Sequence, residues 1–136
     1  MKNRYEWLED YLLSKPGAQK DYKAEWEWWR FRVHEKMFAA ICTPGAKYPA
    51  YGERTIISLK CDMQLAELFR AQYKDVIPGF YMDKANWNSV FLDGDVPGDV
   101  LRGMCDMAYS LVFNKLTKKA QKEVLQYESD NNIGSL

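Results

Sequence analysis

Two patterns of hydrophobic and polar positions divide the chain into strands and helices. Alternation with a period of two residues predicts strands at 25–33, 36–43, 55–61, 80–82 and 87–93. Recurrence at steps of three and four residues predicts helices at 3–14, after Asp62, from Pro97 onward and at 118–127. Short connections between the early strands favour an antiparallel meander. The pattern therefore predicts an α+β domain in which a five-stranded antiparallel sheet carries helices on one face and leaves the other face partly open.

The strand predicted at 25–33 has an uncommon composition. Trp29, Phe31 and Val33 share one face and are expected to point into the core. The opposite face carries Trp26, Trp28, Arg30 and Arg32. One interpretation is that the two outward tryptophans pack under a loop, a terminus or a partner subunit. The other is that they form, with the arginines, a platform for nucleic acid or another ligand.

Length and charge limit the possible classes of protein. The chain has 136 residues, which predicts a single domain over 1–128 followed by a frayed tail at 129–136. Lysine plus arginine and aspartate plus glutamate both number 19, and this balance argues against a strongly cationic binder of polyanions. No segment has the length or apolar character of a signal core or a membrane span. We expect a cytoplasmic protein without a membrane partner.

Few residues suggest chemistry. Cys42, Cys61 and Cys105 are widely spaced in apolar segments, which is typical of reduced buried thiols. His34 is the only histidine, no paired cysteine motif occurs, and no glycine-rich phosphate loop is present. The sequence therefore predicts a non-enzymatic protein with no catalytic residues, no metal site and no cofactor.

Several segments together resemble the MmcQ/YjbR family of small bacterial proteins. They are Val33–Ala39, Ser58–Cys61, Leu65–Leu68, Pro78-Gly79 and Asp83–Gly94, followed by Pro97 and the step Asp106–Tyr109. The resemblance spans most of the chain from Pro16 to Leu116. The family usually has a histidine where this chain has Asn86, and a serine where it has Ala108.

This resemblance implies a CyaY-like fold, similar to that of bacterial frataxin homologues and also described as a double wing. It further implies DNA binding, a label that rests largely on the comparison of folds. The expected contacts are lysine and arginine side chains on phosphates, with aromatic rings against bases or sugars. The candidate residues are Trp26, Trp28, Arg30, Arg32, Lys36, Lys47, Arg54, Lys60, Lys84 and Asn86.

A second hypothesis assigns the same aromatic surface to another kind of ligand. Trp26 and Trp28 are then the centre of a module that binds a protein partner or a small ligand. A homodimer is one such complex, so we expect either a monomer or a weak homodimer. A contiguous positive groove favours DNA, whereas a flat aromatic patch favours association.

Overall fold

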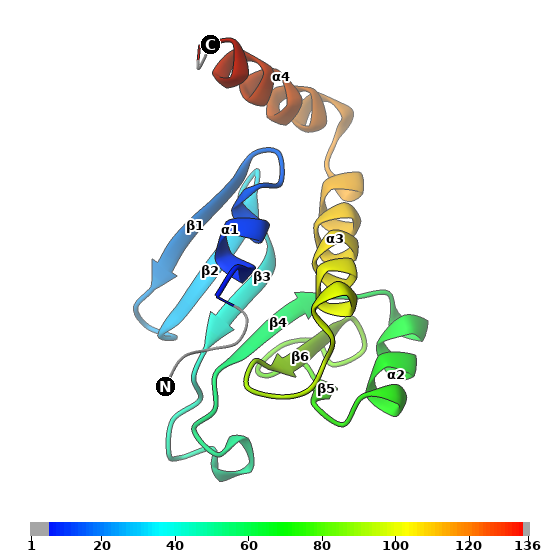
Figure 1. Cartoon of the computed structure of the whole chain (residues 1–136). Helices are drawn as coiled ribbons and strands as arrows, with labels where there is room; N and C mark the ends of the chain where they lie inside the picture. Colours follow the sequence, from blue (N-terminus) through cyan, green and yellow to red (C-terminus); the bar gives the residue numbers. More distant parts are fainter. Residues whose placement is uncertain (1–5, 135–136) are drawn as a thin grey trace.

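A computed structural model of the protein describes residues 6–134, with side chains described up to Gln126 (Figure 1). The helices are α1 (Leu8–Leu13), α2 (Met63–Gln72), α3 (Gly98–Lys115) and α4 (Lys118–Gly134), and η1 is a short 3₁₀ turn at Pro49–Tyr51. The strands are β1 (Ala18–Lys23), β2 (Trp28–Val33), β3 (Lys36–Cys42), β4 (Ile56–Lys60), β5 (Val76–Pro78) and β6 (Trp87–Phe91). No helix among the described residues is long and apolar enough to cross a membrane.

The strands form one antiparallel sheet in the order β1-β2-β3-β4-β6-β5. The α+β class is confirmed, but the predicted number of five strands is wrong, because the sheet has six. The missed strand, β1, has the polar sequence AQKDYK and pairs with β2 at the edge of the sheet. An edge strand needs little apolar surface, so its sequence lacks the alternation by which strands are predicted. The strand predicted at 80–82 lies instead at Val76–Pro78.

Local signals explain where the helices begin. The side chain of Asp62 accepts hydrogen bonds from the backbone N–H groups of Gln64 and Leu65, which caps α2. The Thr117 hydroxyl accepts from the backbone N–H of Ala120 in the same manner at the start of α4. The latter helix continues to Gly134, beyond the predicted end at residue 127. The domain boundary predicted at residue 128 stays a prediction.

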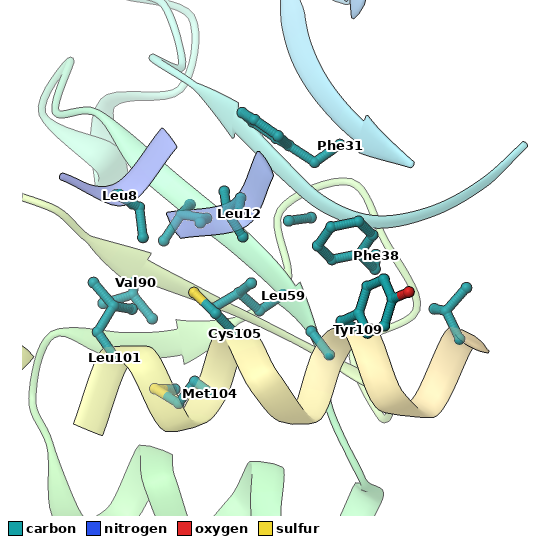
Figure 2. Packing of buried hydrophobic residues seen from close by; sticks show 14 of the residues in the cluster. Leu8, Leu12, Phe31, Phe38, Leu59, Val90, Leu101, Met104, Cys105 and Tyr109 are labelled. Atoms are coloured by element: carbon teal, nitrogen blue, oxygen red, sulfur yellow. The ribbon is translucent and has the colours of Figure 1, made fainter. Parts of the chain in front are cut away.

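The main core lies between one face of the sheet and helices α1 and α3. Figure 2 shows how the helices and the sheet fill this layer, to which Leu12, Leu101, Cys105, Phe31 and Phe38 belong. All five of these side chains have no solvent exposure. Burial of such side chains is the main favourable contribution to folding. The prediction that helices pack on this face is confirmed for α1 and α3.

The opposite face of the sheet carries a second, smaller cluster. It consists of the strand residues Trp28, Ala40, Cys42, Ile56 and Phe91 together with Phe80 of the loop at 79–86. Within the described part of the chain, no helix longer than η1 contributes to this cluster. Loops 43–55 and 79–86 cover it with tyrosine and phenylalanine rings. The face that the sequence predicts to be partly open is thus covered over part of its area by loops.

Candidate functional site

A cavity of about 550 Å³ opens on the loop-covered face of the sheet. Trp28 of β2 and Cys42 of β3 form part of its lining, together with the turn before β2 and the loops at 43–55 and 79–86. Five aromatic side chains line it: Trp26, Trp28, Tyr48, Phe80 and Tyr81. Its size and apolar lining are typical of sites for small molecules. We call it the aromatic cavity.

The rings of the aromatic cavity meet edge to face. Tyr48 lies at 88° to both Phe80 and Tyr81, with ring centroids 5.0 and 5.4 Å apart, respectively. Trp26 and Trp28 meet at 61° with centroids 5.1 Å apart. This arrangement is the favoured one for aromatic pairs, and it sets neighbouring rings at steep angles to one another. The rings therefore form walls around a space instead of filling it as a stack.

Two residues at the cavity have a left-handed backbone conformation, which is uncommon for residues other than glycine. Glu27 has a φ of 58° and Tyr81 a φ of 55°. The Tyr81 hydroxyl also bonds that of Tyr48, so the two loops are tied together across the cavity. This hydrogen bond raises the pKa of Tyr81 above its ordinary value. Strained backbone positions of this kind concentrate at binding sites.

Charged side chains surround the aromatic rings. Glu25 forms an ion pair with Lys23 at 2.9 Å, whereas Glu27 has no ion pair among the described residues. The Nζ atom of Lys47 lies 5.3 Å from the centroid of the Tyr48 ring. The lining thus holds two carboxylates and one amine, a net charge of minus one.

The thiols are poor nucleophiles. Burial raises the pKa of Cys42, which lines the aromatic cavity, to about 12. Burial also raises the pKa of Cys105 to about 12 and that of Cys61 to about 11. All three thiols are free and buried, as the sequence predicts, and they stay protonated at neutral pH.

The structure brings together only some of the residues predicted to bind nucleic acid. Trp26, Trp28 and Lys47 line the aromatic cavity, and Lys84 lines the adjoining hollow. The side chain of Trp26 is half exposed, whereas Trp28 is buried under the loops. The sequence left open whether Trp26 and Trp28 pack under another segment or form an exposed platform. For Trp28, the structure shows packing beneath a loop.

Arg30 and Arg32 do not present free charge. Arg30 makes two hydrogen bonds to the carboxylate of Asp21 on β1, at 2.8 and 3.1 Å. Arg32 reaches the same carboxylate at 2.6 Å. The two arginines hold the pKa of Asp21 below its ordinary value. These contacts fasten β1 to β2 and use the guanidinium groups that the sequence assigns to phosphates.

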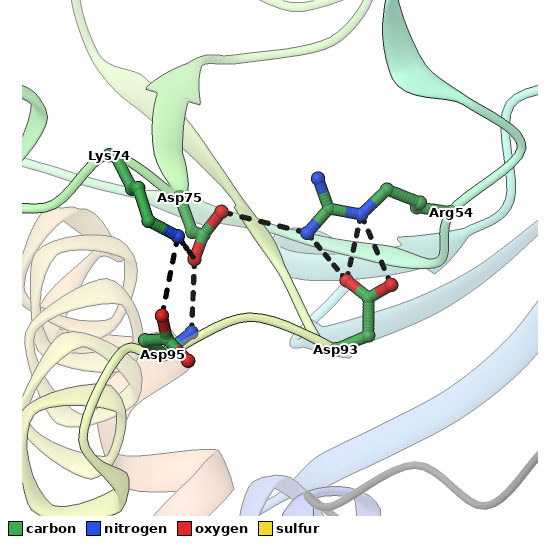
Figure 3. A network of polar contacts seen from close by, with 5 residues as sticks. All are labelled: Arg54, Lys74, Asp75, Asp93 and Asp95. Carbon is green, nitrogen blue, oxygen red and sulfur yellow. Dashed lines mark hydrogen bonds and ion pairs between the residues drawn. The ribbon is translucent and has the colours of Figure 1, made fainter.

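Arg54 belongs to a network of ion pairs and hydrogen bonds just before the start of β4. Figure 3 shows its guanidinium between Asp93, at 2.6 Å, and the buried Asp75, at 3.5 Å. Lys74 and the backbone N–H of Asp95 complete the contacts of Asp75. Because these contacts join the β3–β4 loop to the turns before β5 and after β6, the role of Arg54 here is structural.

The remaining residues predicted to bind nucleic acid differ in how far their side chains are held by other parts of the chain. Lys84 donates to the backbone carbonyl of Gly79, and Asn86 donates to Asp83. Lys60 lies 5.6 Å from the centroid of the Trp87 ring. Lys36 is exposed at the start of β3. None of the three lysines forms an ion pair with a described carboxylate.

Sequence reasoning missed the loop residues of the site. Tyr48, Phe80 and Tyr81 come from segments with no periodic pattern, so nothing in the sequence assigns them to the same face as Trp28. One signal was present, because both loops place large aromatic residues near glycine, with proline inside the first loop and directly before the second. Large aromatic rings in such loops tend to pack against other apolar surface, because an exposed apolar patch is unfavourable in water.

No group of three or more histidine, cysteine, aspartate or glutamate side chains in the described part of the chain could hold a metal ion. His34, the single histidine, lies in the β2–β3 turn, where its Nε2 atom is 3.0 Å from the carboxylate of Glu123 on α4. It is therefore engaged in the contact between the hairpin and α4.

The family model and the related sequences that match this chain point to the same family. A family model described as YjbR matches residues 13–111. A protein of Escherichia coli K12 named YjbR and described as uncharacterised is 31% identical over 119 residues, which cover 88% of this chain and 95% of that protein. An uncharacterised protein of Escherichia coli O157:H7 named YbdF is 34% identical over 68 residues, or 50% of this chain and 56% of its own length.

Solved structures show the same fold. The crystal structure of the Deinococcus radiodurans protein DR2400, a DUF419 domain, superposes with a TM-score of 0.71 at 27% identity. The superposition covers 86% of this chain and 84% of that one. A Pseudomonas syringae protein gives a TM-score of 0.67 at 23% identity, covering 81% and 98% of the two chains. Similarity to frataxin homologues stays a prediction.

Proposed function

The chain belongs to the YjbR family, and we propose that this member is a non-enzymatic binding protein whose ligand enters the aromatic cavity. The observation that carries the proposal is the cavity itself, a space of about 550 Å³ among five aromatic side chains with few charged groups. Concave, mostly apolar sites with a small number of polar groups are the usual form of small-molecule sites.

The chemistry of the lining supports binding without catalysis. Cys42, the one cysteine of the lining, is protonated, and the histidine is engaged with Glu123 at the opposite end of the β2–β3 hairpin. Covalent catalysis needs an activated nucleophile next to a base. Among the described residues of the cavity there is no ionised thiol and no histidine to activate one.

Nuclear magnetic resonance of the indole N–H groups tests the proposal. A library of small fragments, divided into cationic, neutral and anionic sets, is added to the labelled protein. We expect the signals of Trp26 and Trp28 to shift with at least one set, while that of Trp29 stays in place because it lies outside the cavity lining. Absence of any fragment-induced shift at Trp26 and Trp28 would falsify the proposal.

A variant that fills the cavity provides the control. Gly45 lines the aromatic cavity, and a Cβ atom at this position meets no heavy atom within 4 Å. The substitution Gly45→Trp therefore meets no clash at Cβ, and we expect the indole to occupy part of the cavity. We expect it to abolish the fragment shifts and to leave the thermal midpoint nearly unchanged.

DNA binding, the function implied by the family resemblance, is the second candidate. The observation that favours it is that Lys36, Lys47, Lys60 and Lys84 have no carboxylate partner among the described residues, although Lys84 donates to the backbone carbonyl of Gly79. Lys47 and Lys84 lie beside rings of the aromatic cavity and its adjoining hollow, on which an unpaired base could stack. The ion pairs of Arg30, Arg32 and Arg54 weaken the case.

A salt titration tests DNA binding. Four phosphate contacts predict that the logarithm of the affinity falls against the logarithm of salt concentration with a slope of about −3.6 for a duplex and about −2.8 for a single strand. The affinity should then drop about a hundredfold between roughly 50 and 200 mM salt. Fluorescence anisotropy with a labelled single strand and a labelled duplex measures the slope. Binding that does not respond to salt, or no binding at low salt, contradicts this candidate.

A further inference from the structure

We propose that the ligand of the aromatic cavity is an organic cation with a methylated ammonium group, an inference that rests on the proposed function. The rings and the carboxylates of the lining both point to this class. The face of an aromatic ring carries partial negative charge and attracts cations, most strongly in the order tryptophan, tyrosine and phenylalanine. All three kinds of ring line the cavity.

The chain's own cations already lie against the rings of this region. Lys23 Nζ is 5.4 Å from the centroid of the Trp26 ring, and the guanidinium carbon of Arg30 is 6.0 Å from it. Lys47 takes a similar position on Tyr48. Trp28, Phe80 and Tyr81 have no such cation among the described residues. Of these three, Tyr81 is 68% exposed, whereas Trp28 and Phe80 are each 6% exposed. A cation that enters the cavity therefore reaches Tyr81 and the half-exposed Trp26 first.

The charge of the lining favours the same class. Glu27 lines the cavity without an ion pair in the described structure. Its backbone is left-handed, with a φ of 58°. Glu25 lines it as well, although Lys23 binds its carboxylate. Lys47 is the only lysine or arginine of the described lining, and Lys23 neutralises Glu25, so Glu27 is the carboxylate that attracts a cation to the cavity.

A methylated ammonium group fits this chemistry better than a metal ion or a primary amine. A metal ion needs several oxygen, nitrogen or sulfur ligands, and no suitable group of side chains exists in the described chain. A primary ammonium loses strong hydrogen bonds with water when apolar rings surround it. Methyl groups remove those hydrogen bonds and add apolar surface, so the cation can leave water at lower cost.

Calorimetric titration with choline tests the inference. The reference ligand is the neutral isostere of choline, in which a carbon atom replaces the quaternary nitrogen, and adenosine monophosphate represents the anions. We expect choline to bind at least about tenfold more tightly than the isostere, because the two differ only in charge. Adenosine monophosphate should bind more weakly than either.

Three variants separate the contributions of charge and ring. Glu27→Gln should weaken choline about threefold to fivefold and leave the isostere unaffected, since it removes charge but keeps shape. Lys47→Gln should strengthen choline about twofold by removing a repelling charge. Trp26→Ala should weaken choline about tenfold. The matched control is Trp29→Ala, which removes another exposed tryptophan outside the cavity lining.

The outcomes distinguish this inference from the proposed function. If fragments shift Trp26 and Trp28 but choline binds no better than its isostere, the cavity is a binding site and the cation class is wrong. Tighter binding of adenosine monophosphate overturns the cation class in the same way. If neither choline nor any fragment acts on these two indoles, both proposals fail. Equal losses in Trp26→Ala and Trp29→Ala would place the cation outside the cavity.

Discussion

Asp75 shows how a single residue can be decisive for stability. Only 8% of its side chain is exposed, yet it carries a charge. Its Oδ2 atom accepts hydrogen bonds from the backbone N–H of Asp95 at 3.0 Å and from Lys74 at 3.2 Å, and Arg54 lies beside Oδ1. A buried carboxylate is tolerated when partners of this kind satisfy it. The sequence displays Asp75 as one more residue of a polar loop.

Replacing Asp75 by asparagine should reduce the free energy of unfolding by about 2 kcal/mol, because the side chain loses its charge while Arg54 loses a partner. The matched control is Asp95→Asn, whose side chain is 81% exposed and should cost less than about 0.5 kcal/mol. Urea denaturation of both variants measures the difference. Equal effects would mean that burial of Asp75 does not matter.

The same carboxylate makes stability depend on pH. Burial acts to raise the pKa of Asp75, but the backbone N–H of Asp95, Lys74 and Arg54 outweigh it and hold the pKa below its ordinary value. The folded state therefore favours the ionised form. Its contribution is fully present above the unfolded pKa of about 3.9 and is lost as pH falls through the lower folded pKa.

Denaturation series at several acidic pH values should show this loss. We expect the stability difference between the natural protein and Asp75→Asn to be constant above roughly pH 5 and to shrink steadily below about pH 4. A difference that grows on acidification would mean that the folded pKa of Asp75 is raised.

Elements differ in how plainly their sequences predict them. Helix α3 carries an apolar stripe over its whole length, and strands β2 and β4 bury the predicted side chains Phe31 and Ile57. The prediction is wrong for Trp29, which is 43% exposed and packs against Tyr22 of the edge strand β1. The strand at the sheet edge, β1, went unrecognised because its partner β2 supplies its hydrogen bonds and little apolar surface is buried. Helix α2 also departs from its pattern, since Leu68 of its apolar face is 60% exposed.

Two glycines of different elements should respond oppositely to alanine. A Cβ atom at Gly103 in α3 meets no heavy atom within 4 Å, so Gly103→Ala should stabilise the protein by up to about 1 kcal/mol. A Cβ atom at Gly94, in the turn after β6, would lie 2.2 Å from Asp75 Oδ2. Gly94→Ala should therefore destabilise by at least about 2 kcal/mol. Thermal denaturation of the two variants checks the opposite signs.

For the whole molecule, the sheet has two faces of different character. Helices α1 and α3 cover one face with the main core, whereas loops cover the other and leave the aromatic cavity between them. The sequence has equal numbers of basic and acidic residues, and three of its arginines are neutralised by ion pairs in the structure. Arg30, Arg32 and Arg54 each pair with a carboxylate. These ion pairs leave less free positive charge for a broad groove, which supports the proposed binding through the cavity over the DNA candidate.

The sequence by itself determined the α+β class, the antiparallel pairing of the central strands, the long helix α3 and the family. Each of these depends on local periodicity, on capping residues such as Asp62 or on motifs in a fixed order. Only the tertiary structure decided that loops 43–55 and 79–86 fold over Trp28 and enclose a cavity. Contacts between segments so distant in the chain depend on packing in three dimensions, which leaves no periodic trace in the sequence.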